Sequence, residues 1–230
     1  MFIPLKDSAL ILRKPYVTYA LLAINVIVYF YQVTLPEDLY REWFYSAGVV
    51  PYDVFRSNIL TSVPSFFFSL FVHGGFFHLA GNMLYLWIFG DNIESALGHI
   101  RFLLFYLVCG IAATIFQVAI NTASTLPIIG ASGAISGILG AYIIRYSRAR
   151  IQVLIWLIIF IDRIWIPAIY FIGFWFLIQV SNSILSVNYM HRGGVAWFAH
   201  IGGFLAGIIL LLVNDPYERK RIWKKLNQPY

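Results

Sequence analysis

The feature that most constrains this chain is a series of six long, mainly apolar stretches. Each has a length within the roughly 17–25 residues that an α-helix needs to cross the hydrocarbon core of a bilayer. They cover residues 16–34, 76–97, 102–121, 130–146, 165–185 and 194–213. A further apolar run, 151–161, is too short to span alone, and we interpret it as the beginning of the fifth helix or as an interfacial segment. The sequence therefore predicts an all-α polytopic membrane protein with six transmembrane helices.

The composition excludes most classes of soluble protein. Of the 230 residues, 60% are hydrophobic and only 11% are charged, whereas a soluble domain carries about 25% charged residues. So little charge does not cover a water-facing surface, which argues against a soluble enzyme, a disordered chain or a nucleic-acid-binding module. The single cysteine, Cys109, allows no intrachain disulfide and has no partner at the spacing of a zinc or redox motif.

The distribution of lysine and arginine predicts the orientation. With the N-terminus in the cytoplasm, 13 of the 16 basic residues fall inside and three fall outside, namely Arg41, Arg56 and Arg192. This asymmetry satisfies the positive-inside rule. We therefore expect a cytoplasmic segment at 1–15, the bundle at 16–213 and a basic cytoplasmic tail at 214–230, which contacts anionic lipid rather than nucleic acid. Segment 1–15 does not look like a signal or transit peptide, which favours a prokaryotic cytoplasmic membrane.

The first external loop, about 35–75, is rich in aromatic residues such as Trp43, Phe44 and Tyr45. A solvated loop would not have this composition, so we expect the loop to lie partly in the outer interface beside the bundle.

Polar residues within apolar spans mark functional sites or interhelical hydrogen bonds, because they are costly in lipid. His78 and Asn82 lie in the second span, Ser132 begins the fourth, and His200 lies in the sixth. Ser132 is 13 residues before Arg145, the cytoplasmic charge of its span, and His200 is likewise 13 residues before Val213. At 1.5 Å per residue, both side chains lie about 20 Å from the cytoplasmic boundary. The serine and the histidine are therefore level.

Small residues allow the fourth and sixth spans to approach closely. Gly133 and Gly137 line the fourth span, and Gly203 and Gly207 form a small-xxx-small pattern in the sixth. Such packing would bring the Ser132 hydroxyl and the histidine of the sixth span within hydrogen-bond range, about 2.6–3.2 Å.

Three groups are candidates for binding a developing oxyanion. Ser132 begins a helix, where backbone N–H groups lack intrahelical partners. His78 and Asn82 are an i, i+4 pair and project from one helix face. Together with His200 as a base, these residues form the constellation of a nucleophile, a base and hydrogen-bond donors.

These motifs resemble those of the rhomboid family of intramembrane serine proteases. The resemblance rests on Ser132 in GASG, His200 in AHIGGFLAG and the segment HGGFFHLAGN, which begins at His73. It extends to Gly90-x-x-x-Glu94 and to a stretch from Pro167 through Phe174-Trp175-Phe176 to Gln179, and it covers roughly residues 70–210. One departure concerns the first loop, where the Trp-Arg pair of many relatives has only Arg41-Glu42-Trp43 as its nearest counterpart.

The resemblance implies a six-helix core with a Ser–His dyad that opens to the outside through a water-filled cavity. Ser132 would be the nucleophile and His200 the general base, and His78, Asn82 and the Ser132 N–H would form the oxyanion hole. The implied substrates are single-span membrane proteins within the lipid bilayer. We expect supporting roles for His73 and for four glycines, Gly130, Gly133, Gly203 and Gly207. No carboxylate lies level with the dyad, so we expect packing, with Tyr142 as a candidate, to orient His200.

Other interpretations stay open. Ser132 can be a packing residue and His200 an interhelical hydrogen-bond partner. Two other functions are a non-catalytic relative that binds membrane-protein helices, although such proteins usually lack the serine or the histidine, and a transporter. His73, His78 and His200 do not have the spacing of a metal site, so we expect no metal and no cofactor. Asp91 and Glu94 are expected to bond loops and helix ends. The sequence predicts neither an oligomeric state nor the identity of a substrate.

Overall fold

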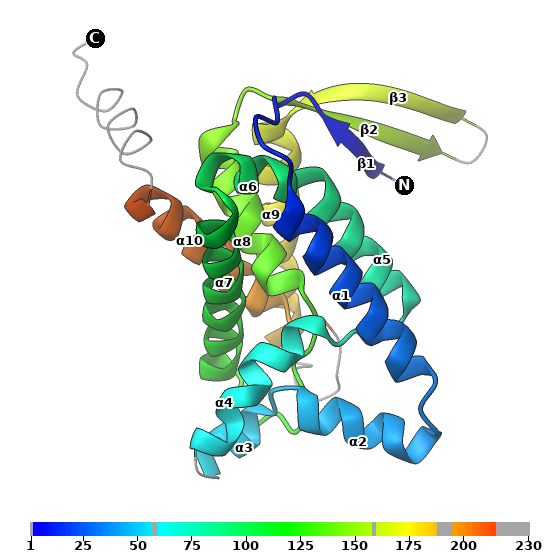
Figure 1. Cartoon of the computed structure of the whole chain (residues 1–230), viewed down its shortest axis with the longest axis vertical. Helices are drawn as coiled ribbons and strands as arrows, with labels where there is room; N and C mark the ends of the chain where they lie inside the picture. Colours follow the sequence, from blue (N-terminus) through cyan, green and yellow to red (C-terminus); the bar gives the residue numbers. More distant parts are fainter. Residues whose placement is uncertain (1, 57–58, 158–159, 188–194, 215–230) are drawn as a thin grey trace.

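The computed structural model describes residues 2–56, 59–157, 160–187 and 195–214, which form a helical bundle (Figure 1). Its main helices are α1 (Tyr16–Val33), α7 (His99–Ile120), α8 (Ser132–Arg145), α9 (Ala168–Ser186) and α10 (Trp197–Asn214). One further helix is continuous through α5 (Phe76–Tyr85), the π-helical turn η2 (Leu86–Gly90) and α6 (Asp91–Leu97). The connection between α1 and α5 contains α2 (Glu37–Ala47), α3 (Pro51–Arg56), α4 (Ile59–Phe68) and the 3-10 turn η1 (Ser69–Phe71).

The described residues confirm a polytopic helical membrane protein. Four helices are long and apolar enough to cross a bilayer, namely α1, α7, α9 and α10. The bent pair Thr61–Phe71 and Phe76–Leu97, whose arms meet at 80°, makes a fifth if it is counted as one span. Helix α8 is apolar but has only 14 residues. Each of the six predicted stretches contains a helix, while six complete spans and the sides of the two termini stay predictions. The basic tail from 215 onward and Arg192 lie outside the described residues.

The segment 151–161 is not the beginning of the fifth helix. It belongs to an antiparallel hairpin of β2 (Arg150–Leu157) and β3 (Phe160–Pro167), and β1 (Phe2–Asp7) pairs with β2 to complete a sheet in the order β1-β2-β3. The fifth helix consequently begins at Ala168 rather than 165. The run is rich in β-branched residues, which favour strands, but a short apolar run cannot be distinguished from a buried helix by periodicity alone.

The sheet lies at the end of the bundle opposite α2, α3 and α4, and its strands project sideways (Figure 1). Ile151 and Val153 of β2 are fully buried. The backbone N–H of Ala168 donates to the carbonyl of Ala149 at 2.7 Å, so the chain closes the hairpin as it starts α9. The strands are thus held against the bundle by apolar burial and by their short connections to α8 and α9.

Helix α8 packs against α7 and α10 at backbone distance. Ten of its 14 residues are buried. A methyl group added at Gly203 or at Gly207 in α10 would overlap the carbonyl oxygen of Gly133 or of Gly137, respectively. On the α7 side, a methyl group at Gly133 would lie 2.6 Å from the Cβ of Ala113. The predicted close packing of the fourth and sixth stretches is confirmed.

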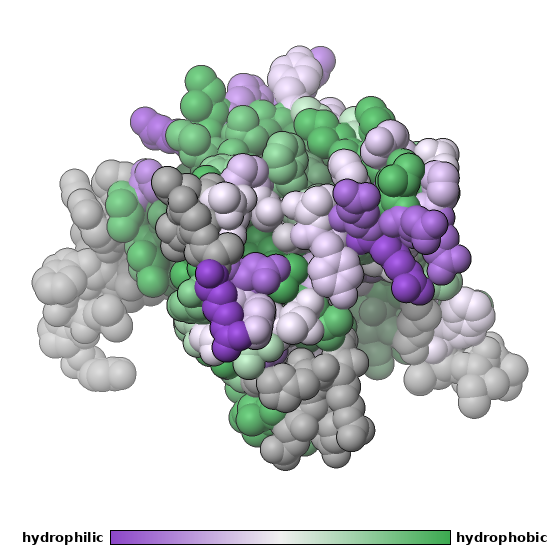
Figure 2. Space-filling model, turned by 90° about the horizontal axis from the view of Figure 1, so that it is seen from below, coloured by the Kyte–Doolittle hydropathy of each residue, from purple (hydrophilic) through white to green (hydrophobic). Residues whose placement is uncertain are grey.

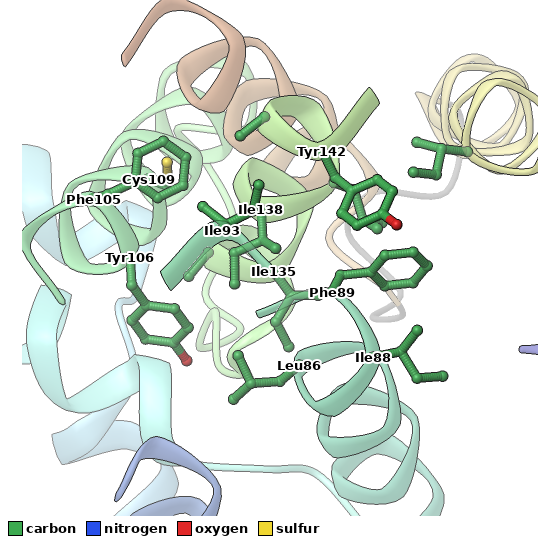
Figure 3. Packing of buried hydrophobic residues seen from close by; sticks show 14 of the residues in the cluster. Leu86, Ile88, Phe89, Ile93, Phe105, Tyr106, Cys109, Ile135, Ile138 and Tyr142 are labelled. Atoms are coloured by element: carbon green, nitrogen blue, oxygen red, sulfur yellow. The ribbon is translucent and has the colours of Figure 1, made fainter. Parts of the chain in front are cut away.

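Large side chains fill the bundle around this contact (Figure 3). Phe89 of η2 and Tyr142 of α8 are fully buried, and their rings meet edge to face with centroids 5.0 Å apart. Tyr106 and Cys109 of α7 are also fully buried, and Figure 3 places them on the opposite side of Ile138 from Tyr142. Small residues therefore define the α8–α10 contact, and bulky residues fill the space beside it.

Glu94 holds the beginning of α1. Its carboxylate is fully buried and accepts hydrogen bonds from the backbone N–H groups of Val17 (2.9 Å) and Thr18 (2.7 Å) and from the Thr18 hydroxyl (2.7 Å). The first N–H groups of a helix have no partners within the helix and favour negative charge. The expectation that this carboxylate bonds a helix end is confirmed.

Asp7 fastens β1 to the bundle. Its carboxylate accepts a hydrogen bond from Asn92 Nδ2 at 2.9 Å and another from the Tyr142 hydroxyl. The same Asn92 amide also donates to the carboxylate of Asp91 at 2.9 Å. Burial raises the pKa of the Asp7 carboxyl above its ordinary value, although the hydrogen bond from Tyr142 opposes the shift.

The glycine contact predicts a large difference between two Gly→Ala variants. Gly207→Ala should lower the melting temperature in detergent, because overpacking a tight interface costs about 1–3 kcal/mol. Gly173→Ala in α9 is the control, since no atom lies within 4 Å of the added methyl group, and it should leave the melting temperature unchanged or slightly higher. Equal melting temperatures for the two variants would contradict backbone-level packing of α8 on α10.

The attachment of β1 should weaken as the pH rises. A carboxyl whose pKa is raised in the folded state stabilises that state below the raised value, and the gain is lost as the pH rises through it. As the pH rises above the ordinary aspartate value of 3.8, amide hydrogen exchange of β1 should therefore accelerate in wild type relative to Asp7→Asn, after correction for the intrinsic pH dependence of exchange. Parallel profiles for the two proteins would contradict a raised pKa of the Asp7 carboxyl in the folded protein.

Candidate active site

Ser132 is the first residue of α8, as the sequence predicts. The chain reaches it through Gly130, whose φ of 111° lies in the left-handed region that favours glycine. The Gly130 N–H donates to the carbonyl of Ser69 at 2.8 Å, which anchors this turn to η1. Because Ser132 occupies the first turn of the helix, its own N–H has no partner within the helix.

The Ser132 hydroxyl and the His200 ring are in hydrogen-bond contact. The distance from Ser132 Oγ to His200 Nε2 is 2.9 Å, and the histidine is 8% exposed. Ser132 directly precedes Gly133, and His200 comes three residues before Gly203, so both side chains project next to the point where the backbones of α8 and α10 touch. The expected level and proximity of the two residues are confirmed.

The other nitrogen of His200 contacts Gln179 of α9, not Tyr142. His200 Nδ1 lies 2.8 Å from Gln179 Oε1. The Tyr142 hydroxyl instead donates to Asp7 at the sheet end of the bundle, so the expectation that Tyr142 orients the histidine is wrong. Counting residues along a helix gives the depth of a side chain, but it does not say which neighbouring helix faces it.

Hydrogen bonds determine the orientation of the glutamine amide and the tautomer of the imidazole. Gln179 Nε2 donates to the carbonyl of Trp175 at 3.0 Å, so Oε1 faces His200. An amide oxygen only accepts hydrogen bonds, so Nδ1 of His200 carries the proton. Nε2 then has a free lone pair, which accepts the hydrogen bond from the Ser132 hydroxyl.

A second glutamine supports the beginning of α10. Gln117 Oε1 in α7 accepts the backbone N–H of Ala199 at 3.1 Å, one residue before His200. The rings of Trp175 and Trp197 flank the imidazole at centroid distances of 6.1 and 5.9 Å. The histidine is therefore held by a backbone anchor, two aromatic neighbours and a hydrogen bond at each ring nitrogen.

His78 lies against the turn that leads to the serine. A methyl group added at Gly130 would lie 2.8 Å from His78 Nε2 and 3.7 Å from Asn82 Nδ2. The Gly74 N–H lies 3.4 Å from His78 Nδ1. If Nδ1 accepts this bond, Nε2 carries the ring proton on the side of Gly130. The structure thus brings His78 and Asn82 together beside the turn that leads to Ser132.

His73 supports Asn82 from behind. It is fully buried, its Nε2 lies 2.9 Å from Asn82 Nδ2, and its Nδ1 lies 3.3 Å from the carbonyl of Phe71. Gln32 of α1 donates to the His73 carbonyl at 2.5 Å. These contacts use one N–H of the Asn82 amide and leave the other for a ligand. His73 is thus a buried structural partner of Asn82.

The candidate catalytic and oxyanion-binding side chains line one cavity of about 990 Å³. Ser132, His200, His78 and Asn82 all contribute to its wall, together with Trp175 and other aromatic residues. The wall also includes the loop before α8 and the first residues of α5 and α10, which places the cavity toward the end that carries α2, α3 and α4. Seen from that end, hydrophilic side chains lie in separate groups among hydrophobic ones (Figure 2).

Within the described ranges, no three His, Cys, Asp or Glu side chains are grouped so that they could hold a metal ion. Among the described residues that line the cavity there is no Asp, Glu, Lys or Arg, and its polar groups are amides, hydroxyls, imidazoles and indoles. The arrangement is suited to transfer of the Ser132 proton to His200 and to binding of a carbonyl oxygen by N–H groups.

Three buried glutamines, Gln32, Gln117 and Gln179, have no role among the expectations from the sequence. Each lies in an otherwise apolar helix, and each makes a hydrogen bond to another helix or to the loop before α5. Their presence in apolar spans is the signal that could have identified them, because a buried amide in lipid needs a partner.

A family model for the Rhomboid domain matches residues 61–214. The match includes every predicted site residue from His73 to Gly207 and extends from α4 to the end of α10.

Curated relatives carry the same family name. The chain is 30% identical to Rhomboid protein 1, mitochondrial, of Saccharomyces cerevisiae over 210 residues, which are 88% of this chain and 55% of that protein. It is 29% identical to the human Presenilin-associated rhomboid-like protein, mitochondrial, over 165 residues, or 68% of this chain and 38% of that protein. RHOMBOID-like protein 5 of Arabidopsis thaliana is 29% identical over 159 residues, 64% and 44% of the two chains. The chain thus spans between 38% and 55% of the length of these three relatives.

The contact between Gly130 and His78 predicts the effect of one methyl group. Gly130→Ala should displace the His78 ring and slow covalent labelling of Ser132 by a fluorophosphonate about 10- to 100-fold, because small misplacements of reacting groups are costly. Gly173→Ala in α9 adds a methyl group with no atom within 4 Å, lies outside the cavity wall and should be labelled at the wild-type rate. Equal rates for all three proteins would contradict a role of His78 in binding the probe.

Proposed function

This chain belongs to the rhomboid family, and on that premise we propose that it is an intramembrane serine endopeptidase. It would hydrolyse peptide bonds in or near transmembrane segments of membrane proteins. The observation that carries the proposal is the 2.9 Å contact between Ser132 Oγ and His200 Nε2 in the wall of a cavity. Nucleophile and base within this distance are the signature of covalent catalysis by serine.

In the first step, His200 Nε2 takes the proton of Ser132 as Oγ forms a bond to the carbonyl carbon of the scissile peptide. The tetrahedral intermediate collapses, the C–N bond breaks, and the protonated imidazole gives its proton to the leaving amine. The product is an acyl-enzyme on Ser132. A water molecule, deprotonated by the same nitrogen, then releases the second product and regenerates the serine.

The negative charge on the carbonyl oxygen requires donors that are already in place. The N–H of Ser132 at the start of α8, the Nε2–H of His78 and the remaining N–H of Asn82 would supply them. Preorganised donors of this kind are worth about 100- to 1,000-fold in rate each in other hydrolases. The hydrogen bond between Asn82 and His73 supports this role, since it fixes the direction of the amide.

The cavity also bears on the class of substrate. A peptide in an α-helix has its carbonyls paired within the helix, so the scissile segment must be extended before Ser132 can reach it. Aromatic residues and neutral polar groups in the wall suit a short, unwound stretch at the end of an apolar helix. We therefore propose single-span membrane proteins, cleaved where their helix unwinds easily, as the substrates.

The bilayer is the setting of this reaction. The excess of basic residues on one side supports an orientation in which the sheet end faces the cytoplasm and the cavity faces outward. The names of two relatives assign those proteins to mitochondria, while the prokaryotic cytoplasmic membrane expected for this chain stays a prediction. No cofactor is needed for the proposed steps.

Substitution of the two reacting residues tests the proposal. In purified protein, Ser132→Ala and His200→Ala should abolish both fluorophosphonate labelling and cleavage of a transmembrane test substrate, because each removes an atom that takes part in bond formation or proton transfer. Ser136→Ala is the matched control. It lies one turn further along α8, and its hydroxyl donates to the Ser132 carbonyl at 2.7 Å, so its loss should leave labelling and cleavage near wild type.

Cleavage that persists in Ser132→Ala would refute the assignment. A folded wild type that is neither labelled nor able to cut the test substrate would favour the alternative of a helix-binding relative without activity.

A further inference from the structure

We propose that Gln179 is a positioning residue for catalysis, so that Ser132, His200 and Gln179 form a hydrogen-bonded triad of neutral side chains. The inference rests on the proposed function and goes beyond the Ser–His dyad that the sequence indicates. It follows from the 2.8 Å contact between Gln179 Oε1 and His200 Nδ1. The three side chains come from α8, α10 and α9, so the triad exists only in the folded bundle.

The donor and acceptor roles within the triad are fixed. The Trp175 carbonyl accepts the Gln179 Nε2–H and thereby aims Oε1 at the imidazole. Oε1 in turn keeps the proton on Nδ1, and the lone pair of Nε2 faces the serine hydroxyl. A reversed amide would present N–H to Nδ1, place the ring proton on Nε2 and make His200 unable to act as a base toward Ser132.

Burial makes this contact consequential. Gln179 is 4% exposed and His200 is 8% exposed, so water does not readily replace a lost partner on this side of the ring. When Nε2 takes the serine proton, the ring becomes positively charged, and the amide oxygen at Nδ1–H stabilises that charge. An unpartnered Nδ1–H in this position would disfavour the charged ring and permit the wrong tautomer.

A neutral hydrogen-bond acceptor for His200 also suits a site inside an apolar bundle. A carboxylate at this point would place an additional charge inside an apolar bundle, where ionised side chains are costly. The amide supplies an acceptor oxygen without that cost.

The first test compares Gln179→Met with Gln179→Glu in purified protein that cleaves a transmembrane test substrate. Methionine preserves length and flexibility but provides only a weak sulfur acceptor, and kcat should fall about 100-fold with KM little changed, because the substrate is still bound while the base is misaligned. Glutamate keeps an oxygen at the same reach and should restore most of the lost kcat, while the cost of a carboxyl group in the bundle should lower the melting temperature. Fluorophosphonate labelling rates should follow the same order.

Ser183→Ala is the control for damage to α9. Its hydroxyl donates to the Gln179 backbone carbonyl at 2.8 Å and is buried in the same helix, yet it does not contact the imidazole. This variant should retain wild-type kcat. If Gln179→Met does not fold, as judged by its melting temperature, Gln179→Leu takes its place in the comparison.

A wild-type kcat in Gln179→Met would overturn the inference and leave the proposed protease intact. The same holds if Gln179→Glu is as inactive as Gln179→Met while both fold and Ser183→Ala is active. A wild type that neither cleaves nor is labelled would instead refute the proposed function itself.

Discussion

The close contact between the backbones of α8 and α10 is the constraint on which the rest of the molecule depends. At Gly203 and Gly207 there is no room for a side chain against the carbonyls of α8. In a bilayer, lipid tails are as apolar as side chains, so helices associate through such close packing rather than through hydrophobic burial. Helices in backbone contact cannot rotate or slide without separating. Ser132 and His200, which lie next to this contact, are therefore held at hydrogen-bond distance.

The two ends of the bundle are held by different kinds of side chain. At the sheet end, the buried carboxylate of Glu94 binds the beginning of α1 and the half-buried carboxylate of Asp7 fastens β1, beside a core of large rings. At the cavity end, neutral amides and imidazoles make the contacts between helices. Gln117 anchors the beginning of α10, and His73 fixes Asn82. One end thus gives a rigid base, and the other presents oriented polar groups to the cavity.

The neutrality of the cavity groups is consistent with chemistry inside a membrane. Proton transfer from Ser132 to His200 creates a pair of opposite charges, and each needs a stabilising dipole that costs little in the resting state. N–H donors toward the carbonyl oxygen and the Gln179 oxygen toward the imidazole provide such dipoles without a permanent charge. The arrangement therefore keeps the cost of polar groups in lipid low until a substrate is bound.

The sequence by itself determined the helical membrane bundle and the level of Ser132 and His200, because apolar length and residue counts along a helix are local properties. It also indicated the glycine contact, since small residues at helical spacing leave few alternatives. It could not identify the sheet, because β2 lies in a short apolar run and its partner β1 is more than 140 residues away in sequence. Nor could it identify Gln179, rather than Tyr142, as the side chain that orients His200. Only the tertiary structure decided these points, because which helix faces a given side chain depends on how the whole bundle packs.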